Sequence, residues 1–160
     1  MSHLLNTSIK KPKFLVTTHS SAQTTSTTAE VGTVITGSEI TYTPTEDAQK
    51  VIYEIGFYAE KINQRSFTGW YLQEYTSGSW SEIESRYRRN FGWQNHDNQA
   101  HRLYTNYRYI LPAWSGSKQL RLVAAFPTGE GNIDLNQLSQ WDGASATTIF
   151  CNTSLLIHSI

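Results

Sequence analysis

The stretch KVIYEIGFYA, residues 50–59, decides the fold class. Its apolar side chains recur at every second position, from Val51 to Phe57. Successive side chains of a β-strand point to opposite faces, so these apolar residues share one face. The segment therefore predicts a strand with one face buried in a core.

Similar segments lie at short spacing on both sides of this strand, separated by turn residues. The other predicted strands are residues 31–36, 39–43, 66–76, 80–91, 102–111, 118–126 and 147–160. Residues 132–142 are ambiguous, because Leu135 and Leu138 also fit one helical turn. About eight or nine short strands without a helical periodicity predict an all-β fold, either an antiparallel sandwich or a barrel.

The composition predicts one domain without disulfides. The chain has 160 residues with 9 Tyr, 6 Phe, 5 Trp and a single Cys. That cysteine, Cys151, excludes an internal disulfide and a cysteine-based zinc site, and we expect it to be buried and unreactive. Residues 17–28 are mostly Ser and Thr, so residues 1–28 are predicted to form a short, extended N-terminal arm, flexible or docked on a partner. Within the arm, residues 13–17 are apolar enough to add an edge strand or to dock on a neighbour, and residues 29–160 form the predicted head domain.

The charge balance argues against nucleic acid and membrane as partners. Lys+Arg 13 and Asp+Glu 13 give a net charge of zero, which provides no general attraction to polyanions. Arg86, Arg88 and Arg89 alternate with aromatic residues, but the preceding Glu82 and Glu84 favour ion pairs between strands or subunits. No apolar run approaches the ~18 residues of a membrane span. The start of the chain lacks the apolar core of a signal peptide, so we expect folding in a cytosol.

Residues suited to catalysis or metal binding are sparse. Glu82 and Glu84 share a strand face, and carboxylate pairs can hydrolyse glycosides, although exposed residues facing a neighbouring Lys or Arg are the simpler interpretation. His96, Asp97 and His101 are metal-ligand types, but their spacing matches no common motif. We therefore expect no enzyme, no metal and no cofactor.

The aromatic residues are too numerous for one small core. Some of them are expected at the surface, where Trp and Tyr bury large areas at interfaces or stack on sugar rings. Trp93 is the strongest candidate because its sequence neighbours are polar. The candidates for an outward receptor- or glycan-binding surface are Trp70, Tyr71, Trp93, His96 and His101.

Several segments, in their order along the chain, resemble one family. They are ITYTP (residues 40–44) followed by KVIYE (50–54), then LRLVA (120–124), and finally TIFCNTSLLI (148–157). This order resembles that of bacteriophage virion head domains, those of marine and cyanobacterial phages in particular. Their jelly roll is of the tumour-necrosis-factor or complement-globular-head type.

The resemblance implies an antiparallel jelly-roll β-sandwich that assembles as a homotrimer in a virion made in the host cytoplasm. Such proteins are capsid knobs, capsid-decorating proteins or fibre tips. The N-terminal arm would bind other virion proteins, and a host-surface glycan is a further candidate partner. The expected residues at the threefold axis are Leu155, Leu156 and Ile157.

Two alternatives stay open at the level of the sequence. A free-standing carbohydrate-binding, lectin-like module would be monomeric and would gather its aromatic residues on one exposed face. A glycan-cleaving enzyme would act through Glu82 and Glu84.

Overall fold

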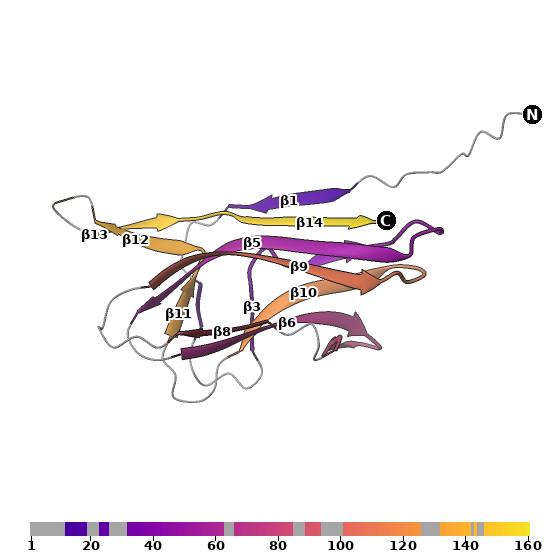
Figure 1. Ribbon diagram of the computed structural model, residues 1–160, viewed down its shortest axis with the longest axis horizontal. Coiled ribbons are helices and arrows are strands. Elements are labelled where there is room, and N and C mark those ends of the chain that lie inside the picture. Colours follow the sequence, from indigo (N-terminus) through magenta and orange to yellow (C-terminus); the bar gives the residue numbers. More distant parts are fainter. Residues whose placement is uncertain are drawn as a thin grey trace, which may run out of the picture.

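The computed structural model of the protein describes residues 12–18, 23–25, 32–62, 66–84, 89–93, 101–125, 132–141, 143 and 146–160. These residues form two six-stranded antiparallel sheets, A and B, and a separate two-stranded hairpin (Figure 1). They contain no helix, which confirms the all-β prediction. The described residues accordingly include no helix that is long and apolar enough to cross a membrane.

Sheet A is organised around a long central strand. Its strands are β1 (Lys13–Thr17), β2 (Gln23–Thr25), β5 (Lys50–Ile62), β9 (His101–Pro112), β11 (Asn132–Leu135) and β14 (Thr153–Ser159). β9 pairs with β5 from Lys50 opposite Pro112 to Lys61 opposite His101. β14 and β11 share the other edge of β5, and β1 and β2 extend the sheet beyond them.

Sheet B is organised around two adjacent strands. Its strands are β3 (Thr33–Val34), β4 (Ile40–Tyr42), β6 (Ser66–Thr76), β7 (Ser79–Glu82), β8 (Arg89–Trp93) and β10 (Lys118–Ala125). β10 pairs with β6 on one side and with β3 and β4 on the other. β7 and β8 both pair with the outer edge of β6, so the predicted single strand 80–91 is two strands.

Several strand pairs are nested along the sequence: the two strands of each inner pair lie between the two strands of the next outer pair. β1 pairs with β14, β4 with β10, β5 with β9, and β6 with β7. One long antiparallel hairpin rolled up into two sheets has this order, which is the topology of a jelly roll. The jelly-roll sandwich is thereby confirmed.

The core lies between the sheets and is built as the alternation of residues 50–59 predicts. Val51, Tyr53, Ile55 and Phe57 are all fully buried. Trp70 of β6 meets the Phe57 ring edge-on, with 5.1 Å between the ring centroids. Such pairs join the two sheets through both buried area and ring geometry.

Residues 132–141 are strands, not the helical turn that Leu135 and Leu138 also fit. Asn136 ends β11 with a φ of 59°, a left-handed conformation that asparagine tolerates. Its N–H donates to the Tyr58 carbonyl and its carbonyl accepts from Cys151 N–H, both at 2.8 Å. This kink turns the chain out of sheet A into the hairpin of β12 (Gln137–Trp141) and β13 (Ala146–Phe150), which projects from the sandwich (Figure 1).

Residues 13–17 form an edge strand, one of the two expected outcomes for this segment. β1 pairs with β14 from Lys13 opposite Ile157 to Thr17 opposite Thr153. The Lys13 ammonium also donates to the Thr41 carbonyl at 2.8 Å, which ties the edge of sheet A to β4 of sheet B. The rest of the predicted arm, apart from residues 12, 18 and 23–25, lies outside the described residues.

A buried tyrosine predicts a pH-dependent stability. The Tyr53 hydroxyl donates to the Ser38 carbonyl at 2.5 Å. Burial, followed by the nearby Tyr109, raises the pKa of Tyr53 well above its ordinary value. The protonated form is thus favoured in the folded state, so its stabilising effect is complete below the unfolded-state pKa of about 10 and is lost as the pH rises above it. We expect the free energy of unfolding to fall by up to about 1.4 kcal/mol per pH unit above pH ~10 because of this residue.

The measurement is urea unfolding of the wild-type chain and Tyr53→Phe between about pH 8 and pH 11. The phenylalanine variant should show a shallower decline in the free energy of unfolding. Equal slopes for the two chains would contradict the assignment of this titration to Tyr53.

Candidate functional site

Among the described residues, the outer face of sheet A stands out because exposed apolar side chains cluster on it. It is formed by the side chains that point away from the core on four adjacent strands. Residues that lie directly opposite each other on neighbouring strands point to the same face of the sheet. The strand register therefore shows which residues of β1, β14, β5 and β9 lie side by side on this face. The residues of this outer face are Phe14, Val16, Ile52, Glu54, Tyr58, Tyr104, Asn106, Arg108, Ile110, Ser154, Leu156 and His158.

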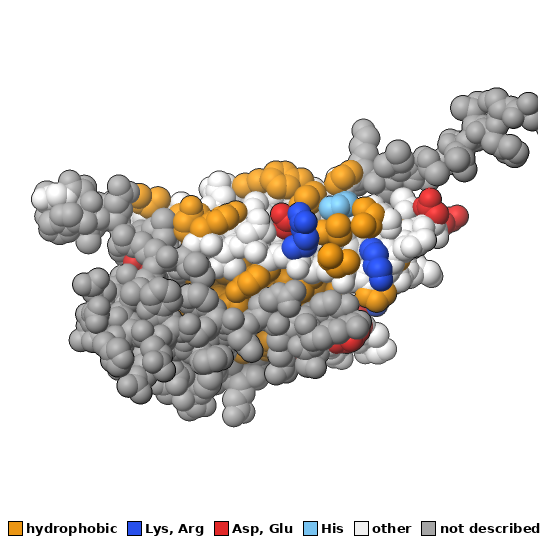
Figure 2. Space-filling model, in the orientation of Figure 1, with side chains coloured by type: hydrophobic (Ala, Val, Ile, Leu, Met, Phe, Trp, Pro, Cys, Tyr) orange, Lys and Arg blue, Asp and Glu red, His pale blue; other side chains and the backbone are white. Residues whose placement is uncertain are grey.

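This face is apolar to an unusual extent for a surface. Phe14, Val16, Tyr104 and Ile110 are each between 51% and 63% exposed. Figure 2 shows hydrophobic side chains gathered over β1, β14, β5 and β9, around one cluster of opposite charges. A solvated antiparallel sheet ordinarily carries polar residues on its outer face, so a clustered apolar surface indicates a binding surface.

The charges in the middle of this face neutralise each other. Arg108 Nε lies 2.7 Å from Glu54 Oε2, and Asn106 Nδ2 lies 3.5 Å from Glu54 Oε1. Glu54 and Arg108 are opposite each other on β5 and β9. The pair is therefore satisfied within one protomer and can be covered by another surface without leaving an unpaired charge.

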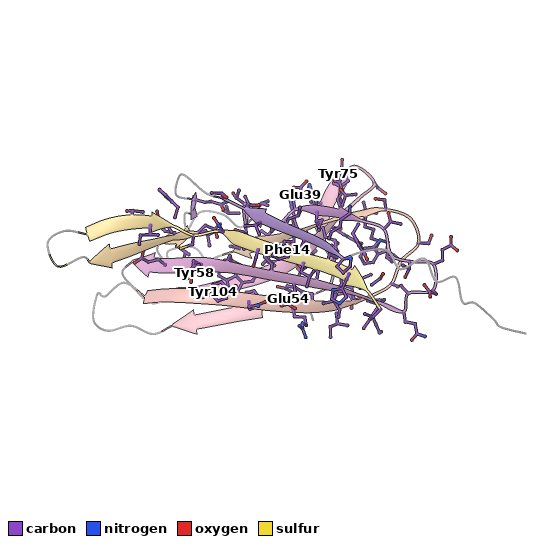
Figure 3. The ribbon with its side chains drawn as sticks, turned by 90° about the horizontal axis from the view of Figure 1, so that it is seen from above. Phe14, Glu39, Glu54, Tyr58, Tyr75 and Tyr104 are labelled. Carbon is purple, nitrogen blue, oxygen red and sulfur yellow. The ribbon has the colours of Figure 1, made fainter. Side chains whose placement is uncertain are left out.

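Two tyrosines contact each other on the same face, and a glycine makes room for one of them, Tyr104. Tyr58 and Tyr104 are opposite each other, with ring centroids 4.9 Å apart. A Cβ built on Gly56 would lie 3.1 Å from Tyr104 Cζ and 2.8 Å from Ser154 Oγ. In Figure 3, Phe14, Glu54, Tyr58 and Tyr104 lie along β1, β5 and β9, whereas Glu39 and Tyr75 lie on the opposite side of the molecule.

β1 is exposed on both of its sides. Phe14 and Val16 point outward, and Leu15, which points the other way, is still 44% exposed. The strand therefore overhangs the edge of the sandwich, with apolar side chains uncovered on two faces.

On the outer face of sheet B, in contrast, an aromatic ring is covered by a polar side chain of the same sheet. Arg121 stacks over the Trp80 ring at 4.0 Å from the centroid, and its Nε donates to Gln73 Oε1 at 2.9 Å. Partial burial lowers the pKa of Arg121, although Glu39 and Tyr71 act in the opposite direction. Here the aromatic face is already covered by a polar side chain, so the two sheets present different outer surfaces.

Of the predicted receptor residues, Trp70 and Tyr71 are the two whose side chains the structure describes, and they lie on opposite faces of β6. Trp70 is 1% exposed and fills the core, so its assignment to an outward surface is wrong. The fold places it there because inward and outward side chains alternate along β6, and its neighbour Tyr71 is half-buried on the outer face. Trp93 and His101 belong to β8 and β9, but their side chains, like the whole of His96, lie outside the described residues.

Of the predicted axis residues, only Leu156 faces outward. Leu155 and Ile157 are fully buried inside the protomer, which corrects their assignment to a subunit interface. Alternation along β14 places them against the core, with Leu156 between Phe14 and Glu54 on the outer face.

The candidate chemical residues gather into no site in the described part of the chain. Glu82 ends β7, and Glu84 lies exposed two residues later. No group of three or more His, Cys, Asp or Glu able to hold a metal occurs among the described residues. Burial raises the pKa of the half-buried Cys151 thiol, which keeps it protonated and weakly nucleophilic at neutral pH.

Apart from Leu156, the outward residues of sheet A are functional candidates that the sequence alone did not identify. A signal was present: Ile52 and Ile110 stand at the outward positions of strands whose inward positions are already apolar. Only the register, which pairs Ile52 with Ile110 and Phe14 with Leu156, shows that these exceptions form one surface.

The comparisons with solved structures include a weak likeness to a viral chain. No family model and no curated protein matches the chain. A chain from the structure of infectious bursal disease virus Gx strain is similar over 93% of this protein, with 10% sequence identity and a TM-score of 0.35. This protein spans 38% of that chain. The conclusions on assembly and binding therefore rest on the residues of this chain.

Proposed function

We propose that the protein is a bacteriophage virion structural protein, a knob, fibre or capsid-decorating head domain that assembles as a homotrimer. The observation that carries the proposal is the apolar outer face of sheet A, with its internally paired Glu54 and Arg108. The sequence resemblance to phage head domains and the jelly-roll topology support it. In this proposal the protein is made in the host cytoplasm and acts in the virion.

The occupant of this face is another copy of the same chain. The charges of Glu54 and Arg108 at the centre of this face cancel each other. Two copies of the chain that approach through this face therefore do not repel each other through these charges. Apolar side chains are exposed on both sides of β1, so each protomer offers two different surfaces to its neighbours. Contacts between unlike surfaces are heterologous, and they close into a ring when the rotation permits. A ring of three is the closure that the family resemblance implies.

The remaining parts of the proposal concern partners. The arm that precedes β1 would attach the trimer to other virion proteins, and a host-surface glycan is the further candidate ligand. Three sites on one trimer would bind a repetitive surface with avidity.

The assembly is tested by the mass of the full chain in solution, measured by size exclusion with light scattering. We expect a trimer for the wild-type chain and loss of the trimer in Phe14→Asp, which places a charge in the apolar face. An unpaired buried charge weakens association by at least about tenfold.

The matched control is Tyr75→Asp. Tyr75 is also an exposed aromatic residue, at 42%, but it lies on sheet B. The Tyr75→Asp substitution should therefore leave the trimer intact. A wild-type chain that is monomeric at micromolar concentration would overturn the proposal and favour the free-standing carbohydrate-binding module. A Phe14→Asp chain that remains a trimer would overturn the proposed interface on the outer face of sheet A.

A further inference from the structure

Trp114 stands at one end of the sandwich, in the turn between β9 and β10. Ala113 N–H donates to the Gln49 carbonyl at 3.1 Å, which fixes the start of this turn beside β5. The Trp114 ring meets Tyr42 edge-on, with 6.4 Å between centroids, and packs against the core while remaining half-exposed. The indole is therefore held in place by the fold and is still accessible.

Two hollows adjoin this indole, and Ala113 and Trp114 line both. One is a cavity of about 250 Å³, whose polar lining residues are Glu74, Glu84 and Lys118. The other is a cavity of about 430 Å³, lined by residues of the β4–β5 loop and by Ser115. Both are concave and combine one aromatic residue with a few polar groups, and the larger has a volume within the range of about 300–1,000 Å³ that small-molecule sites occupy.

The polar groups beside Trp114 are fixed. Lys118 Nζ lies 2.6 Å from Glu74 Oε2 and 5.5 Å from the centroid of the Trp114 ring. Both side chains are partly buried, with exposures of 35% and 22%. A donor and an acceptor are thereby held next to the indole at set positions.

The Trp114 indole also carries an unused donor. Its Nε1 is buried and has no hydrogen-bond partner among the residues that the structure describes. Buried N–H groups are nearly always paired in folded proteins, so this unpaired indole donor is an exception. Thr43 and Thr45 line the larger cavity and offer hydroxyl groups of their own.

We propose that Trp114 and the two hollows form a saccharide-binding site. A sugar ring presents an apolar face of C–H groups, which stacks on indole, and a rim of hydroxyls that both donate and accept. Glu74 and Glu84 would accept from hydroxyls, and Lys118 would donate to them. Two hollows around one indole fit consecutive sugar units, so the ligand is a short oligosaccharide.

The charges of the site favour a neutral ligand. Lys118 is neutralised by Glu74, while Glu46 adds negative charge to the larger cavity. An acidic sugar would therefore be repelled. All of these residues come from one protomer, so the site does not depend on the proposed trimer.

The experiment is titration calorimetry of the full chain with maltotriose, cellotriose, mannotriose and chitotriose, with 3′-sialyllactose as the acidic probe. We expect binding of at least one neutral trisaccharide and none of the acidic one. Trp114→Ala should weaken that binding by at least about tenfold. Trp80→Ala is the matched control, because Arg121 already covers the Trp80 ring, and it should leave affinity unchanged.

Two further variants separate this site from folding and assembly. Because Trp114 packs on the core, Glu84→Gln is included as a conservative change at an exposed position, and it should lower affinity while the chain retains a cooperative thermal transition. Phe14→Asp should bind the trisaccharide as the wild-type chain does. Absence of binding at about 10 mM for every neutral probe, or equal affinity in Trp114→Ala, would overturn the proposal.

Discussion

A chain that ends at Ser154 is expected not to fold. The truncation removes Leu155 and Ile157, two fully buried core residues, and most of the β14 backbone that pairs with both β1 and β5. Loss of one such side chain to Ala costs about 2–5 kcal/mol, and a whole domain is stable by only about 5–15 kcal/mol. Removing both side chains together with two rows of hydrogen bonds exceeds that margin. Circular dichroism during heating should show no cooperative transition.

Leu156→Ser provides the control for the truncation. Leu156 lies in the same strand but on the outer face, so this variant should retain a cooperative transition. A truncated chain that still melts cooperatively would contradict the placement of β14 in the core. The same placement means that truncation is unsuitable as a test of the trimer, because unfolding would dissociate any oligomer.

Trp70→Ala is expected to lower the free energy of unfolding by about 3–5 kcal/mol. Trp70 is 1% exposed, and its ring lies 5.1 Å from the Phe57 centroid and 6.2 Å from that of Tyr107. Truncation leaves a cavity where the two sheets meet, and the surrounding rings belong to rigid strands that cannot close it. Urea unfolding monitored by circular dichroism measures the change.

Trp80→Ala is the corresponding control. Trp80 is half-buried on the outer face of sheet B, where its loss removes the stacking of Arg121. That contact is worth about 0.5–1 kcal/mol at an exposed site. If the two tryptophan variants were equally destabilised, Trp70 would not be the core residue that the structure shows.

The inward half of each strand was predictable because alternation is a local property. Val51, Tyr53, Ile55 and Phe57 share one face whatever the rest of the chain does. For the same reason Thr105, Tyr109 and Leu111 are buried on β9 as the pattern 102–111 predicts. Tertiary contacts decided the ambiguous region instead: the left-handed Asn136 is held by Tyr58 and Cys151, which are distant in sequence.

The outward surfaces were predictable only in part. Composition shows that aromatic residues exceed one core, but it does not show which of them face outward. Trp70 and Tyr71 are neighbours in sequence and lie on opposite faces of β6, so the choice between them needs the pairing of β6 with β10. The apolar face of sheet A is assembled from residues as distant as Phe14 and Ile110, which no local pattern connects.

The antiparallel pairing of β1 with β14 also gives the fold a direction of mechanical weakness. Lys13 lies opposite Ile157, so the start of β1 and the end of β14 are at the same end of the ladder (Figure 1). A force that pulls these two ends apart loads one rung at a time and opens the ladder progressively. A force along the strands would instead load all rungs together in shear. Tension between these ends would therefore peel β1 from the sandwich first, while β14 remains held by β5.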